Sequence, residues 1–185
     1  YLSSPQSFKY LRIFLNDNSA NVRKITFQIF AKVSKQNPLL VASYTRYAIQ
    51  DAFFIIRQAN SIRDVAQYVD TLPYLINAAA PMIQTYSGGF IDICMTLLTN
   101  PIPKFVNFIE EDAYNTVLIG VIDSLALLAP LDPPQVAYYE DVFIPLVCDI
   151  LLTNDNRRLS LSILKFFLAL LTAPSSSAKH SYREK

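Results

Sequence analysis

The chain has 185 residues, of which 52% are hydrophobic and 17% are charged, and this composition excludes a disordered chain because it supplies ample apolar surface for a core. The formal net charge of +1 excludes a large uniform field that would attract nucleic acid or an anionic membrane. Gly occurs 3 times and Pro 11 times, a balance that disfavours phosphate-binding loops and β-barrels and favours helices punctuated by prolines.

Apolar periodicity and helix-ending residues predict helices along most of the chain. A leading helix covers residues 5–15. Three helix pairs follow, and a further helix begins a fourth pair. In chain order, the pairs cover 20–35 with 39–57, 62–79 with 82–99, and 111–129 with 135–153, and the last helix covers 156–172. A polar segment follows from Ser175 to Lys185.

Four prolines recur at a nearly constant interval. They are Pro38, Pro81, Pro130 and Pro174, and they lie 43, 49 and 44 residues apart. Each follows an amphipathic run and precedes a tyrosine at a similar offset, namely Tyr44, Tyr86, Tyr139 and Tyr182. The interval lies at or just beyond the period of about 40–47 residues found in HEAT and armadillo repeats. The predicted unit is a first helix that ends at a Pro-bearing turn, a second helix and an Asn/Asp loop.

The first helix of each unit carries an apolar stripe with steps of three and four, which places the stripe on one face. The stripes are Val22/Ile25/Ile29/Val33, Val65/Val69/Leu72/Ile76, Val117/Val121/Leu125/Leu128 and Leu161/Leu164/Leu168/Leu171. Stacked units bury such faces against one another, so we predict an all-α fold, an α-solenoid of antiparallel helix pairs. One array spans 1–185, with units near 1–15 (partial), 16–60, 61–105, 106–154 and 155–185 (partial). We expect a piece of a longer protein that exposes apolar surface at its ends.

Motifs for catalysis, metal binding and cofactor binding are absent from the sequence, so we predict no catalytic, metal or cofactor site. The single histidine, His180, lies in the polar tail. Cys94 and Cys148 lie in apolar runs, where buried reduced thiols are expected. The longest apolar run, Val117 to Leu131, contains Asp123 and is too short to cross a bilayer, so no transmembrane segment is predicted.

Three local features have ordinary structural interpretations. Gly88-Gly89 is expected to bend the entry of a helix, because a phosphate cradle needs a preceding strand and more glycines. The acidic trio Glu110–Asp112 is expected at a helix N-terminus, where carboxylates favour the helix dipole, rather than as a metal site or an acid–base pair. Arg157 and Arg158 follow a helix start. They are expected to be solvated or ion-paired within the repeat, with a partner contact as the alternative.

The first unit carries a distinctive set of motifs, which are Phe14-Leu15-Asn16-Asp17, Val22-Arg23, Lys32-Val33-Ser34, Asn37-Pro38, Val41 and Arg46. This set resembles the HEAT region of the target of rapamycin (TOR) kinases, a family of phosphatidylinositol-3-kinase-related kinases. The sequence departs from the family pattern at Ala31, where Gly is usual, and at Ser43-Tyr44, where Pro-Phe or Pro-Ser is common. The likeness continues in Ala80-Pro81 with Tyr86 and in Tyr182-Arg183-Glu184-Lys185. Outside the first unit the pattern is general to HEAT repeats.

The resemblance implies a non-catalytic, cytoplasmic protein-interaction scaffold whose parent is a serine/threonine protein kinase with its catalytic domain outside this chain. It also implies docking of raptor-like or other regulatory subunits, self-association of the parent and its recruitment to endomembrane surfaces, without nucleic-acid partners. The alternative is a HEAT scaffold of another class, a nuclear transport receptor or a phosphatase scaffold subunit. Within the chain, the candidate binding surface is the loop Asn100–Asp112, because it is the longest connector.

Overall fold

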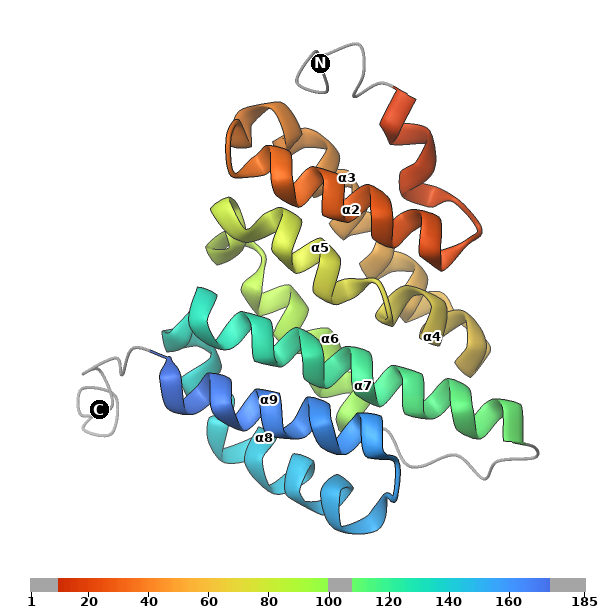
Figure 1. The fold of residues 1–185 in the computed structure, drawn as a ribbon, viewed down its shortest axis with the longest axis vertical. Helices are drawn as coiled ribbons and strands as arrows, with labels where there is room; N and C mark the ends of the chain where they lie inside the picture. Colours follow the sequence, from red (N-terminus) through yellow and green to blue (C-terminus); the bar gives the residue numbers. More distant parts are fainter. Residues whose placement is uncertain (1–9, 100–107, 174–185) are drawn as a thin grey trace.

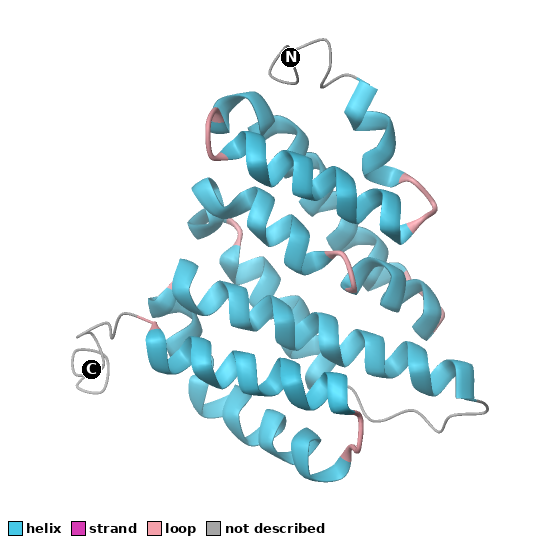
Figure 2. Cartoon of the chain, viewed as in Figure 1, coloured by secondary structure: helices cyan, strands magenta, loops and turns pink. Residues whose placement is uncertain are grey.

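A computed structural model describes residues 10–99 and 108–173, and the regular secondary structure in these two ranges is entirely helical (Figure 2). In chain order the helices are η1 (Arg12–Asn16), α2 (Ala20–Ser34), α3 (Pro38–Gln58), α4 (Ile62–Val69), α5 (Leu72–Ala79), η2 (Ala80–Thr85), α6 (Ser87–Thr99), α7 (Phe108–Leu131), α8 (Pro133–Thr153) and α9 (Arg157–Thr172). The predicted all-α class is therefore confirmed. Residues 5–9 of the predicted leading helix lie outside the described residues; Tyr10 and Leu11 are helical, and the chain then tightens into the 3-10 helix η1.

The helices form two layers (Figure 1). α2, α4, α5, α7 and α9 lie in the nearer layer, and α3, α6 and α8 lie behind them. Within the nearer layer, α2 packs on α5, both α4 and α5 pack on α7, and α7 packs on α9. The rear helices α3 and α8 pack on α2 and α7, and α6 contacts both α7 and α8. α2 and α9 therefore lie at opposite ends of the nearer layer.

The prolines begin helices as well as ending them, which corrects the predicted role of Pro38. This residue is in the first turn of α3, and the Asn37 side chain caps the helix by accepting a hydrogen bond from the Leu40 amide at 3.3 Å. Proline is tolerated there because the first N–H groups of a helix have no partner within it. Pro81 lies within η2, and Pro130 lies in the last turn of α7.

The helix predicted over 62–79 is interrupted, so that α4 and α5 are separate helices on either side of Thr71. Pro73 lies in the first turn of α5, and it has no N–H to donate to the Val69 carbonyl four residues earlier. The Thr71 hydroxyl donates a hydrogen bond to the Tyr68 carbonyl at 2.7 Å. All four residues of the predicted stripe in this region are nevertheless buried.

α7 is the central helix, and it contacts α4, α5, α6, α8 and α9. Its predicted stripe is entirely buried. Gly120 allows α7 to approach α4 closely, because a Cβ atom at this position would lie 2.7 Å from the Val69 carbonyl oxygen. Among the described residues, Ile109–Leu131 is the one helix long and apolar enough to cross a membrane by length and composition. It is longer than the predicted run, and its place in the core accounts for its apolar character.

Arg23 is a charged side chain buried in the core, with 1% of its surface exposed. Its Nη1 donates to the Asp17 carbonyl, and its Nη2 donates to the Gln67 carbonyl at 2.8 Å. The guanidinium carbon lies 4.4 Å from the centre of the Tyr68 ring. Burial lowers the pKa of Arg23, and the nearby Tyr68, Asp17 and Asp70 partly oppose this shift. Arg23 therefore joins the turn that precedes α2 to the helix α4.

The glycine pair belongs to the body of α6 rather than to a bend at its entry, which corrects that expectation. A Cβ atom on Gly89 would lie 2.7 Å from the Phe53 ring on α3. The Phe53 ring meets the Phe90 ring edge to face, with centroids 4.9 Å apart. Because Gly89 has no side chain, the Phe53 ring can approach α6 closely and contact Phe90. This aromatic pair joins the rear helices α3 and α6.

α2 buries its predicted stripe incompletely. Val33 is buried, but Ile25 is exposed to solvent. α2 is covered by α5 and α3 and, in part, by the short η1, so one side of this terminal helix stays open. The expected apolar surface is therefore present at this end of the described structure.

Candidate interaction surface

α9 is held at the other end of the nearer layer by its N-cap and by one packed face. The Asn156 side chain accepts hydrogen bonds from the amides of Arg158 and Leu159, at 3.0 and 3.3 Å, which is the capping role that Asn commonly takes at a helix start. Leu159, Ile163 and Phe166 are buried, and α9 makes its most extensive packing with α7. The cap at Asn156 and the packing of the buried face therefore fix the position and rotation of α9.

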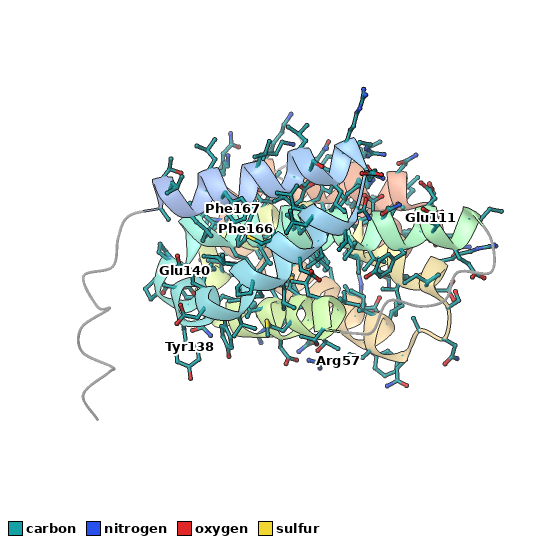
Figure 3. All side chains as sticks on the ribbon, turned by 90° about the horizontal axis from the view of Figure 1, so that it is seen from below. Arg57, Glu111, Tyr138, Glu140, Phe166 and Phe167 are labelled. Carbon is teal, nitrogen blue, oxygen red and sulfur yellow. The ribbon has the colours of Figure 1, made fainter. Side chains whose placement is uncertain are left out.

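The other face of α9 carries four exposed leucines at helical spacing, which we call the leucine ridge. It consists of Leu161, Leu164, Leu168 and Leu171, whose exposed fractions run from 54% to 84%. When the molecule is viewed from the end at which α9 lies, side chains project from α9 on the side away from Phe166 (Figure 3). Fully burying an exposed leucine side chain contributes about 1.5–3 kcal/mol of favourable free energy. Covering the four leucines of the ridge would therefore favour association strongly.

The ridge corrects one prediction and agrees with another. Its spacing was predicted, but the stripe was expected to pack inward as the equivalent stripe of α7 does. The buried face of α9 instead uses Leu159, Ile163 and Phe166 together with Ser162. α9 therefore has two apolar faces, and one of them lies open at the end of the layer, where exposed apolar surface was expected.

Cations border the ridge on the same exposed side of α9. Arg157, Arg158 and Lys165 are all exposed, and none of them forms an ion pair with another residue that the structure describes. The segment Arg157–Thr172 contains no Asp or Glu. Of the two expectations for the arginines, solvation or an ion pair within the repeat, the described residues favour solvation.

A second surface feature is a polar depression of about 420 Å³ between the start of α7 and the loop that joins α8 to α9. Glu111 and Asp112 line it from α7, and Asp155 lines it from the loop. One wall is fixed by a hydrogen bond from the Asn154 side-chain amide to the Asn115 side-chain oxygen, at 2.9 Å. Side chains of this kind suit cationic or hydrogen-bonding groups of a partner.

The candidate binding loop Asn100–Asp112 falls partly on this depression. Its residues 100–107 lie outside the described residues, as do Pro174, His180 and Tyr182. The remaining part begins α7, where Glu110 and Glu111 occupy the first turn, as predicted. Across the described ranges, no group of three or more His, Cys, Asp or Glu side chains is arranged to hold a metal ion.

The two cysteines differ in their surroundings. Cys94 is buried, its Sγ lies 4.0 Å from the Val121 carbonyl oxygen, and burial raises the pKa of the thiol to about 12. Since the thiolate is the reactive form, Cys94 is inert near neutral pH. Cys148 is a free thiol that is only partly buried, so the expectation of burial is right for Cys94 and wrong for Cys148, which lies on the outer helix α8.

No protein-family model and no curated protein sequence matches this chain. Function is therefore inferred from the surface of the molecule, and the leucine ridge is the feature that sequence reasoning described least well. The signal that could have revealed its direction was present in the sequence. Lys165 lies four residues after Leu161 and three before Leu168, on the same helical face, and a lysine on that face indicates contact with solvent.

Proposed function

We propose that this chain is a non-catalytic protein-interaction scaffold, a segment of a HEAT-type α-solenoid. The observation that carries the proposal is the leucine ridge on α9. Between α2 and α9, each helix of the nearer layer is covered by a neighbouring helix on both sides. α9 has the same two-sided apolar design, but only the side toward α7 is covered. A further helix that packs on the ridge would continue the stack, as repeat arrays require.

The resemblance to the TOR family supports a finer assignment, to the HEAT region of a serine/threonine protein kinase of that family. The motif residues of the first unit act together at one junction. Leu15 is buried, the Asp17 carboxylate accepts a hydrogen bond from the Ser19 amide at 2.8 Å, and Arg23 binds the Asp17 carbonyl.

The later motif residues of the first unit have structural roles of the same kind. Asn37 caps α3, and Val41 is fully buried behind that cap. Arg46 donates a hydrogen bond from Nε to the Tyr86 hydroxyl at 3.0 Å, so a motif residue of the first predicted unit contacts the repeated tyrosine of the next. These roles give the shared motifs a physical reason and support the family assignment.

In this proposal the chain shapes a complex and docks regulatory subunits such as raptor-like proteins, and it acts in the cytoplasm. Phosphoryl transfer is carried out by a kinase domain elsewhere in the parent protein. The gene offers a direct test. Its reading frame should continue into a kinase domain with an Asp-bearing catalytic loop, and a reading frame that ends without one would overturn the TOR assignment.

The role of the ridge as an interaction face is tested by replacing its four leucines with glutamine in the complete 185-residue chain. Exposed substitutions change stability by about 0.5 kcal/mol or less each, so the variant should keep its helical circular dichroism and melt within a few degrees of wild type. Its binding of the apolar dye anilinonaphthalene sulfonate should fall. The matched control is Ile163→Ala on the buried face of the same helix, which should cost about 2–5 kcal/mol. A ridge variant that unfolds would show that the ridge belongs to the core.

A further inference from the structure

The charges beside the leucine ridge describe the partner that fits it. Arg157, Leu161 and Lys165 are spaced by four residues, so they form one row along α9. Leu164 and Leu168 form the adjoining row. The apolar seat is therefore bordered by cations, and these cations have no ion-pair partner among the described residues. Arg157 and Arg158 also lie in the first turn of α9, where the positive end of the helix dipole raises the positive potential further.

We propose that the leucine ridge binds an amphipathic helix whose apolar stripe is bordered by Asp or Glu. This inference rests on the proposed scaffold function and names the chemistry of the partner. Arg157 and Lys165 are eight residues apart, which is about 12 Å along a helix. The partner presents carboxylates with that separation, about two helical turns, on the edge of its stripe. The four leucines extend over eleven residues, Leu161 to Leu171, so about three turns of the partner helix lie on the ridge.

A second copy of this chain fits the ridge poorly. Two α9 helices packed against each other would bring together surfaces that carry Arg157, Arg158 and Lys165 and no acidic side chain. Like charges held close at an interface oppose association. A partner helix with acidic borders avoids this repulsion. It also forms ion pairs with the cations of α9, and these pairs strengthen as the neighbouring leucines are removed from water.

The last residues of the chain do not have the composition of that partner. The segment 174–185 contains Lys179, Arg183 and Lys185 against the single acid Glu184. It also contains no Leu, Ile, Val, Phe or Met. A helix that complements the ridge needs the opposite charge and an apolar stripe, so the segment 174–185 does not supply it.

Two synthetic peptides test the proposal against the full chain. Each is about 18 residues long, which is sufficient for helix formation in isolation, and each carries leucines at helical spacing on an alanine background. One borders the stripe with glutamates, and the other borders it with lysines. Fluorescence anisotropy with a fluorescein label should show that the glutamate peptide binds at least tenfold more tightly. The difference should shrink as NaCl is added, because salt screens exposed charges.

Three variants locate the binding site and its charge dependence. Leu164→Asp combined with Leu168→Asp should abolish binding of the glutamate peptide. The matched control is Leu39→Asp, an exposed leucine on α3 with 87% of its surface accessible, and it should bind as wild type does. Arg158→Glu combined with Lys165→Glu should weaken binding of the glutamate peptide and strengthen binding of the lysine peptide. Such a reversal distinguishes recognition of charge from loss of folding.

Several results would overturn the proposal. These are absence of binding by the wild-type chain, equal affinities for the two peptides, and a preference that the Arg158/Lys165 variant leaves unchanged. Sedimentation of a dimer that the Leu164/Leu168 variant abolishes would make a second copy the occupant instead. Failure here leaves the proposed scaffold function standing as long as the glutamine ridge variant stays folded, whereas unfolding of that variant would remove the scaffold argument itself.

Discussion

Replacing Gly120 with alanine should destabilise the protein, although alanine is the better helix former. The new Cβ would lie 2.7 Å from the Val69 carbonyl oxygen and 2.9 Å from Val69 Cγ1, whereas ordinary contacts begin at 3.4 Å. Because the closest atom belongs to the backbone, α7 and α4 must move apart. Overpacking of this kind costs about 1–3 kcal/mol, and the gain in helix propensity is about 1 kcal/mol. Because the Val69 backbone cannot rotate away as a side chain can, the cost lies in the upper part of that range, at about 2–3 kcal/mol, and we expect a net loss of about 1–2 kcal/mol.

Urea unfolding followed by circular dichroism measures this loss, and Gly88→Ala is the matched control. A Cβ atom on Gly88 would meet only the Gln135 side-chain nitrogen, at 3.7 Å, which is an ordinary contact. The same substitution in α6 should therefore leave the unfolding midpoint unchanged or raise it, with a gain of up to about 1 kcal/mol. A Gly120 variant as stable as wild type, or equal losses in both variants, would refute the close approach of α7 to α4.

Three further measurements test other contacts of the core and surface. Arg23→Leu should cost about 2–4 kcal/mol in thermal unfolding, because it removes the two hydrogen bonds from the buried guanidinium to the Asp17 and Gln67 carbonyls; a loss below about 1 kcal/mol would contradict a structural role for these bonds. With Ellman's reagent near pH 8, Cys148 should react first and Cys94 only in denaturant, since the pKa of Cys94 is about 12; equal rates would contradict its burial. Asp92→Ala should cost less than about 1 kcal/mol, because the Arg57–Asp92 ion pair is exposed, and a larger loss would show that the pair does more than a surface contact.

The sequence predicted most helices of the described ranges because their apolar periodicity and capping residues act locally. α2, α3, α8 and α9 begin and end within about three residues of the prediction. The interruption between α4 and α5 was missed, although Pro73 and Thr71 were visible. Apolar periodicity runs through both residues, and periodicity alone does not register a lost backbone hydrogen bond.

The direction of an apolar face depends on neighbours, and this is where prediction failed. The stripes of α4/α5 and α7 are buried because helices lie on both sides of them. The stripe of α9 has the same spacing, yet its leucines are exposed because the other face of α9 is the one that contacts α7. Likewise, Arg23 was read as part of a motif, but its burial depends on carbonyls from residues six and 44 positions away. Contacts of that range are set by the tertiary fold and not by the local pattern.

The way in which Arg23 is held has a consequence for how the protein responds to acid. Both of its hydrogen bonds end on main-chain carbonyls, which do not titrate, and an arginine guanidinium stays charged at any pH that a cell reaches. A buried arginine held by carboxylates would lose its partners as those acids became protonated. The two hydrogen bonds by which Arg23 joins the turn before α2 to the helix α4 therefore do not depend on the ionisation of a carboxylate.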